Sequence, residues 1–276
     1  MILMRVALKI AYIGSSYRGS QVQPGVSTIE GKLFEALQSL EIIGDPSSAR
    51  FVSSGRTDTG VHAMGQVVAF NTDKPKLAIP RVINSKLPGD IWAWSRAEVD
   101  SDFHPRRYAI NRTYRYITPS MDADISKIRA ACSILEGSHD FANFCFRDTG
   151  RSTIRRIEKI DVRLAGNLLR IDITANSFLW KMIRKIVTAL LLVGSGARDL
   201  DWLENMLDPA SYEEGVKPAK PYGLILTDVN YGDSVQWVDD GYSMRRSRER
   251  IEEYLVYHQV LAEVMDQFLP KEQKAE

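Results

Sequence analysis

The sequence predicts an α+β fold that contains two α/β units, and three observations lead to this class. Residues 1–104 alternate between strand and helix patterns in the order β-α-β-β-α-β, which is the ferredoxin-like arrangement. The residues that follow repeat this alternation without detectable sequence repetition. The 276-residue chain is long enough for two domains of ordinary size.

The elements of the first unit follow from apolar periodicity. Residues 5–13 place Val6, Leu8 and Ile10 on one face, which is the pattern of a half-buried strand. After a polar loop, Ser27-Thr28-Ile29-Glu30 predicts a capping box at the start of an amphipathic helix. The unit is completed by strands at 50–53 and 66–70, a helix near 79–86 and a strand at 91–99.

The second unit begins near Pro105. Its strands are expected at 112–118, 154–164, 167–174 and 224–231, and its helices at 125–135, 178–193 and 200–207. The tail, residues 244–269, carries apolar residues at helical spacing, and we expect this helix to bury them against the second domain. The predicted domains are therefore 1–104, 105–235 and a helical extension over 236–276.

Composition argues against several classes of protein. Cys132 and Cys145 lack the spacing of metal ligands, so we expect reduced, buried thiols in a cytoplasmic protein, with no metal and no cofactor. Arg5 and Lys9 interrupt the apolar residues of the N-terminus, which does not fit a signal peptide. The longest apolar run, 186–194, is far shorter than a membrane span of about 20 residues.

The loop Ser53–Ala63 carries the most informative residues. It joins two predicted strands and holds Asp58 between Gly55 and Gly60, which allow a positive φ or the close approach of a ligand. A carboxylate held in this way can act as a nucleophile, a base or a metal ligand. The same pattern is typical of an Asx-turn, in which Asp58 caps its own loop.

A second motif, Asn111–Tyr116, combines aromatic and basic side chains. On a strand, Tyr114 and Tyr116 share one face and Arg115 lies on the other. This arrangement suits stacking on an unpaired base with phosphates nearby. Alternating tyrosines also simply fill a sheet face, so both interpretations stay open.

Basic residues recur through the second unit. One cluster comprises Arg106, Arg107, Arg112 and Arg115, and another comprises Arg147, Arg151, Arg155, Arg156 and Lys159. The helix expected at 178–193 adds a face with Lys181, Arg184, Lys185 and Thr188. Such groups can follow a phosphate backbone, although solvated strand edges and helix faces give the same pattern. The net charge of +1 does not by itself indicate a nucleic-acid partner.

These strings resemble the motifs of the tRNA pseudouridine synthase A family. Further matches occur in the family order at 17–25, 84–91, 137–141 and 221–224, so the resemblance covers roughly residues 5–231. One departure is Ser20, where many relatives carry Trp; it bears on the RNA contacts of the first loop and not on the chemistry.

The resemblance implies a fold, an activity and site residues. Two ferredoxin-like domains would join into a central, mostly antiparallel sheet with helices on one side and an RNA-binding cleft. The protein would isomerise uridine to pseudouridine in the anticodon stem-loop of tRNA, at tRNA positions 38, 39 and 40. Asp58 aligns with the catalytic aspartate, and Arg184 with the arginine that keeps it ionised and oriented. The implied substrate-binding residues are Tyr114, which stacks on the target base, Arg56, Val61 and His62.

Two other classes of protein stay open. A catalytically silent RNA-binding module would keep the basic clusters and tyrosines without needing Asp58 or Arg184. A carboxylate hydrolase of the glycosidase type would need a second acid near Asp58, and no candidate is close in sequence. The expected partners are tRNA and, in a homodimer, a second copy of the chain, with no membrane.

Overall fold

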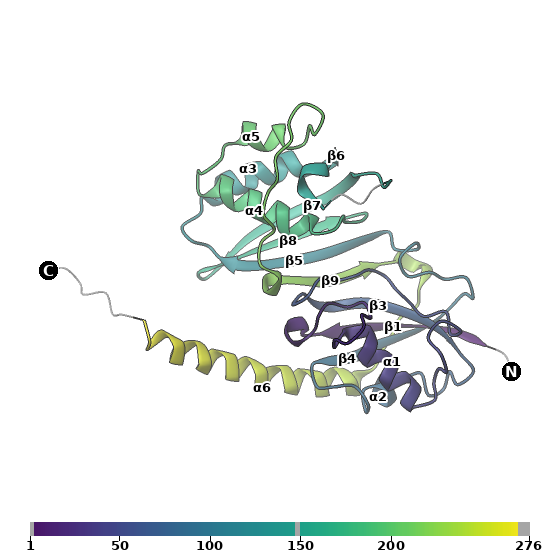
Figure 1. Ribbon diagram of the computed structural model, residues 1–276. Helices are drawn as coiled ribbons and strands as arrows, with labels where there is room; N and C mark the ends of the chain where they lie inside the picture. The colour runs from purple at the N-terminus through teal and green to yellow at the C-terminus, as the bar shows by residue number, and fades with distance from the viewer. Residues whose placement is uncertain (1–2, 147–149, 270–276) are drawn as a thin grey trace.

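The computed structural model describes residues 3–146 and 150–269 (Figure 1). Its strands are β1 (Met4–Tyr12), β2 (Val52–Ser53), β3 (His62–Thr72), β4 (Ile91–Val99), β5 (Asn111–Pro119), β6 (Gly137–Asp140), β7 (Ile154–Ala165), β8 (Leu168–Ala175), β9 (Leu224–Asn230) and β10 (Val238–Asp239). Its α-helices are α1 (Ile29–Ser39), α2 (Pro80–Ile83), α3 (Ile125–Leu135), α4 (Met182–Gly194), α5 (Leu200–Asn205) and α6 (Gly241–Asp266).

The described strands form one ten-stranded sheet that runs through the whole molecule. Nine of them follow in the order β10-β4-β1-β3-β9-β5-β8-β7-β6, and β2 pairs with β3 beside this path. The pairings are antiparallel except for β3 with β9, which is parallel. The predicted α+β class with a mostly antiparallel sheet is confirmed.

The two halves of the sheet repeat one topology. In the first half the order is β4-β1-β3-β2, and in the second it is β9-β5-β8-β7, so each half places its last strand beside its first. The predicted β-α-β-β-α-β order is confirmed in the first half. The domain limits at 104/105 and 235/236 stay a prediction.

The edge of β3 is shared between the two halves. Val52 and Ser53 of β2 pair with Ala69 and Val68 near the end of β3, whereas β9 pairs with His62 and Ala63 at its start. Between these two pairings the loop 54–61 leaves the sheet. We call the β3–β9 pairing the seam, because it joins the two halves edge to edge.

Three predicted boundaries differ from the structure, each for a local reason. The strand expected at 50–53 shortens to β2, because Arg50 adopts a left-handed φ of 50° and turns the chain. The helix expected from Phe178 begins only at Met182, because Lys181 has a φ of 61°. The residue that caps α1 is Thr28, whose Oγ1 accepts from the N–H of Gly31; the capping box predicted from Ser27 is wrong.

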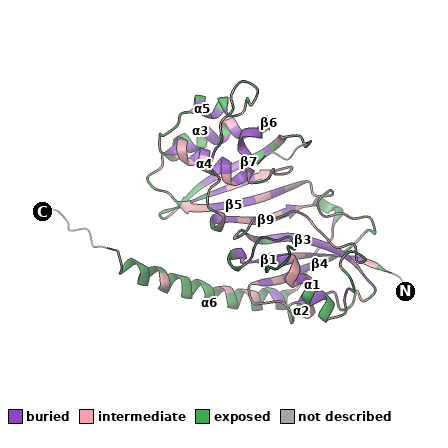
Figure 2. Cartoon of the chain, viewed as in Figure 1, coloured by how far each residue is buried: buried purple, intermediate pink, exposed green. Residues whose placement is uncertain are grey.

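The expected docking of the tail is also wrong. α6 packs against β4 and α2, which belong to the first half, and projects away from the body of the molecule (Figure 1). Along this helix only Ser243 is buried, and most of its apolar residues face solvent, whereas Ile251 and Leu261 are half-buried (Figure 2). No helix among the described residues combines the length and apolar character that crossing a membrane requires.

Candidate active site

Asp58 lies in the loop 54–61, at the point where the edge of β3 passes from β2 to β9. The side chain of Gln66 in β3 fills this fork. Its Nε2 donates to the carbonyl of Gly55 over 2.9 Å, and its Oε1 accepts from the hydroxyl of Ser54 over 2.5 Å. A side chain thus continues the hydrogen bonding of β2 where the strand ends, and this fixes the start of the loop.

A second segment clamps the loop directly before Asp58. The N–H of Thr57 donates to Ser20 Oγ over 2.8 Å, and the N–H of Ser20 donates to the carbonyl of Thr57 over 3.0 Å. The hydroxyls of Tyr12 and Thr57 lie 2.8 Å apart and share a hydrogen bond. Ser20 and Tyr12 are both buried, so the backbone that carries Asp58 is held from the interior. The expectation that Ser20 bears on RNA contacts and not on the chemistry is therefore wrong, because its buried side chain supports the loop that carries Asp58.

The carboxylate of Asp58 reaches across the seam to residues of the second half. Its Oδ2 accepts from Arg184 Nη1 over 2.8 Å, and its Oδ1 accepts from Trp180 Nε1 over 3.1 Å. Arg184 is fixed in turn, because its Nε donates to the carbonyl of Ala219 over 2.6 Å. The expected pairing of Asp58 with Arg184 is confirmed, and the Asx-turn interpretation is wrong.

The exposure of this pair suits a reactive carboxylate. The side chain of Arg184 is 11% exposed, whereas that of Asp58 is 26% exposed, so the acid can still be reached from solvent. A charge-assisted hydrogen bond from a largely buried arginine fixes the direction of the carboxylate.

The start of α4 does not form the solvated basic face that was one interpretation of its sequence. Lys185 is buried, and its Nζ donates to the carbonyls of Asn143 and Cys145 over 3.2 and 3.0 Å. Because Lys181 precedes the helix with a positive φ, Trp180 is turned toward Asp58. Sequence reasoning missed Trp180, although its position four residues before Arg184 was a signal.

Tyr114 lies beneath the site and is 8% exposed. Its ring meets Phe178 edge to face at 5.3 Å between centroids, and burial raises the pKa of its hydroxyl to about 12. The phenol is therefore neutral at physiological pH. Tyr116 shares this face as expected and donates to the carbonyl of Lys220, so it fills the sheet face rather than presenting itself to a ligand.

The other implied substrate-binding residues differ in their surroundings. Arg56 is exposed and makes no ion pair with the residues that the structure describes. Val61 is buried in the core, which does not favour direct contact between its side chain and a substrate. The positive φ expected in the loop occurs at Gly60 and not at Gly55.

His62 bridges two loops beside the site. Its Nδ1 accepts from the N–H of Gly14 over 3.1 Å, and its Nε2 lies 3.1 Å from the carbonyl of Tyr222. An accepting Nδ1 requires the neutral ring, with the proton on Nε2 directed at Tyr222. Burial agrees with this state, because it lowers the pKa of His62 below its usual value.

The basic clusters are only partly available to a ligand. Arg112 is buried and donates to the carbonyls of Asn176, Ser54 and Arg106. Arg115 forms a two-pronged ion pair with Asp172. Arg147 lies outside the described residues. The basic residues that face solvent are Arg106, Arg107, Arg151, Arg156 and Lys159.

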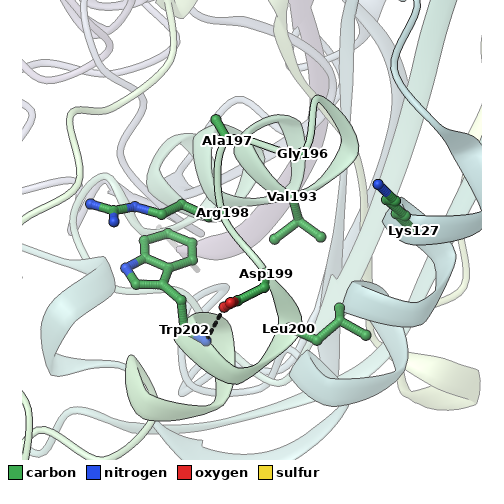
Figure 3. Close-up of a pocket in the computed structure, with 8 residues that line it drawn as sticks. All are labelled: Lys127, Val193, Gly196, Ala197, Arg198, Asp199, Leu200 and Trp202. Carbon is green, nitrogen blue, oxygen red and sulfur yellow. Dashed lines mark hydrogen bonds between the residues drawn. The ribbon is translucent and has the colours of Figure 1, made fainter.

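A pocket elsewhere in the molecule does not include these residues. It lies between the end of α4 and the start of α5 and is lined by Lys127, Val193, Arg198 and Trp202 among others (Figure 3). Within it the carboxylate of Asp199 accepts from the N–H of Trp202 and caps α5. This is ordinary helix capping, so the candidate site remains the one at Asp58.

Comparison with known proteins gives a consistent result. The profile of a family described as "tRNA pseudouridine synthase" matches residues 131–232. A protein of Methanococcoides burtonii named "tRNA pseudouridine synthase A" is 59% identical over 273 residues, which cover 99% of each chain. Proteins of the same name from Methanosarcina acetivorans and Archaeoglobus fulgidus are 54% and 41% identical, over 98% and 96% of this chain and 100% and 98% of their own. These similarities therefore include both halves of the sheet and α6.

Proposed function

The chain belongs to the tRNA pseudouridine synthase A family, and we propose that it isomerises uridine to pseudouridine in the anticodon stem-loop of tRNA, at tRNA positions 38, 39 and 40. The observation that carries this proposal is the Asp58–Arg184 pair, which joins the two halves of the sheet at a carboxylate that solvent can reach. The silent RNA-binding alternative is not supported, because a relative that is 59% identical over almost its whole length is named as a synthase.

The reaction breaks the C1′–N1 bond of uridine, turns the base and rejoins it through C5. Substrate and product are isomers, so the balance of the reaction needs no redox partner and no group donor. The uridine must leave the base stack, which costs a few kcal/mol. We assign to Asp58 either the attack on the uridine or the removal of a proton from it. Arg184 orients the carboxylate of Asp58.

Two further residues have proposed roles around the target uridine. The ring of Tyr114 would stack on the uracil, which has to enter the site to reach this largely buried side chain. Arg56 would fill the space that the flipped base leaves or hold its phosphate, since it is exposed two residues before Asp58. His62 would hold the loops that border the substrate, and Val61 would act through its backbone.

The experiment that tests the proposal maps uridine isomers in tRNA before and after incubation with the protein. We expect pseudouridine in the anticodon stem-loop with the parent chain and none with Asp58→Asn, which should still bind tRNA. Substantial turnover by Asp58→Asn would contradict the role of Asp58. Turnover at other sites of the tRNA would contradict the proposed positions only.

A second copy of the chain is the other proposed partner, and α6 is the surface that would bind it. Tyr254, Tyr257, Leu261 and Val264 of α6, with Phe268 two residues beyond its end, follow at spacings of three and four residues, which is the pattern of a coiled-coil seam. We call these five residues the α6 stripe. Four of them are at least 38% exposed in the single chain. Burial against a partner would remove this apolar surface from water.

The charges of α6 favour an antiparallel partner helix of the same kind. The half 241–250 carries four arginines and one glutamate, whereas 251–266 carries Glu252, Glu253, Glu263 and Asp266 and no lysine or arginine. This distribution opposes the dipole of the helix itself. Two antiparallel copies would place the basic half of one against the acidic half of the other. RNA or lipid is a less suitable partner for α6, because the acidic half would repel their phosphates.

Sedimentation of the full chain tests this partner. We expect a dimer that Leu261→Asp, in the α6 stripe, converts to a monomer, while Gln259→Asp on the polar side leaves the dimer intact. A parent chain that stays monomeric at micromolar concentration would contradict the proposal. The three-part domain division and a cytoplasmic location remain proposals beside it.

A further inference from the structure

Phe146 and Trp180 form an exposed aromatic pair at the entrance to α4. Trp180 is 59% exposed and Phe146 is 42% exposed. Their ring centroids lie 5.2 Å apart with 46° between the ring planes. Tryptophan is usually well buried, so an indole with more than half of its surface in water needs an explanation.

The backbone holds this pair in place. The N–H of Phe146 donates to the carbonyl of Trp180 over 3.1 Å, which ties the two segments together. The left-handed conformation of Lys181 interrupts the chain directly before α4 and turns the indole out of the helix. A residue other than glycine adopts this conformation at a cost, so the surroundings enforce it.

A cation accompanies the two rings. Lys181 Nζ lies 4.2 Å from the centroid of Phe146 and 4.9 Å from that of Trp180. Exposed aromatic rings beside a lysine are the two components of sites for single-stranded nucleic acid, where bases stack on rings and phosphates meet cations.

We propose that Phe146, Trp180 and Lys181 bind the unpaired nucleotide next to the target uridine, with its base stacked on the rings and its phosphate at Lys181. This inference rests on the proposed function. The position follows from the hydrogen bond between Trp180 Nε1 and Asp58 Oδ1, which places the edge of the indole 3.1 Å from the carboxylate. A nucleotide on the outer face of the same indole is therefore one step from the reacting uridine.

The site has a stated chemical preference. Stacking uses the face that every base has, so the site accepts any nucleobase in an unpaired strand. A nucleotide inside a duplex has both faces covered by its stacked neighbours and is excluded. The site thus selects a substrate whose local structure has opened, without reading its sequence.

Trp180 could act by stacking on a base or by holding Asp58 through its N–H. Two substitutions separate these roles. Trp180→Phe removes the N–H but keeps a ring for stacking. Trp180→Ala removes both. Tyr242→Ala is the matched control, since Tyr242 is 51% exposed at the start of α6.

The test measures the binding of an anticodon stem-loop that carries 2-aminopurine beside the target uridine, whose fluorescence falls when the base stacks. For Trp180→Ala we expect affinity to fall about 5- to 150-fold and the quenching to be lost, as the removal of one stacked base predicts. Trp180→Phe should retain the quenching and bind within about threefold of the parent, and Tyr242→Ala should match the parent. Thermal unfolding of each variant shows that the fold is kept.

The outcomes distinguish this site from the proposed function. Normal binding and quenching by Trp180→Ala would overturn the site and leave the function standing. Equal losses in Trp180→Phe and Trp180→Ala would overturn it too, because the N–H and not the ring would then be responsible. If the parent chain does not bind the stem-loop, the proposed function fails together with the site.

Discussion

Arg184 and Asp58 face each other across the seam of the sheet, with 2.8 Å between Nη1 and Oδ2. They are 126 residues apart in the chain and belong to different halves. The Nε of Arg184 is already committed to the carbonyl of Ala219, so the guanidinium approaches the carboxylate in one orientation. The site is therefore assembled only when both halves are in place.

The fixed orientation of Arg184 predicts how its substitutions behave. Arg184→Met should lose activity by about 100-fold or more, since removing one preorganised donor to a reacting group has this effect. Arg184→Lys should retain part of the activity, because lysine keeps the charge but not the two-directional fork of donors. Single-turnover rates of pseudouridine formation, with circular dichroism as a control for folding, measure both. Equal activity of the two variants would contradict the role of the charge.

Tyr114 predicts a loss of stability at alkaline pH. Its pKa is about 12 in the folded chain and about 10 when unfolded, so its contribution is complete below pH 10 and disappears as the pH rises toward 12. Burial also raises the pKa of Tyr12 and Tyr231, with the same sign. Tyr114→Phe should therefore lose less melting temperature between pH 10 and 12 than the parent. Identical slopes for the two proteins would argue against this burial effect.

His62 predicts a loss of stability in acid. Its pKa is lowered in the folded chain, so its contribution is present above the unfolded value of about 6.5 and is lost as the pH falls through the folded value. Protonation also places a hydrogen on Nδ1, which removes the acceptor for Gly14. The melting temperature should fall between pH 7 and 5. In His62→Gln, which does not titrate, this slope should be smaller, and an unchanged slope would assign it to other groups.

Ser20 predicts an effect on stability and on rate together. Ser20→Ala leaves the buried N–H of Thr57 without its acceptor and should lower the free energy of unfolding by about 1–3 kcal/mol. Because Thr57 precedes Asp58, the rate of isomerisation should fall as well. Urea unfolding and the isomerisation assay test this, with Ser101→Ala at an exposed position as the control. A variant with normal stability would show that the clamp does not hold the loop.

The sequence predicted the strands and helices of the sheet well where one pattern was uninterrupted. The limits of β4 and α3 are as expected, because alternation and helical periodicity run through them without a break. Single residues with positive φ, Arg50 and Lys181, shortened two other elements. Nothing in their side chains indicates this conformation, which the surrounding structure imposes.

The chemical site was predicted in part for a related reason. The Asp58–Arg184 pair followed from a family resemblance, whereas Trp180 and Ser20 depend on contacts between segments far apart in the chain. The burial of charged side chains could not be predicted from the sequence either. Lys185 and Arg112 look like surface residues in the sequence, yet their charged groups bind backbone carbonyls inside the protein.

The C-terminal helix shows a further limit of prediction from the sequence. Apolar residues at helical spacing predict that a helix face is covered, but they do not identify the covering surface. The face expected against the second domain is exposed on α6 instead.

The forked edge of β3 also constrains how this protein can be redesigned. Two strands use successive stretches of one edge, and only residues 64–67 of β3 lie between their pairings, so β2 and β9 have little room to extend toward each other. Inserting residues into the loop 54–61 would either shift the register of β2 against β3 or move Asp58 out of contact with Arg184 in α4. For a protein engineer, the length of this loop is therefore constrained as well as the identity of its functional residues Arg56 and Asp58.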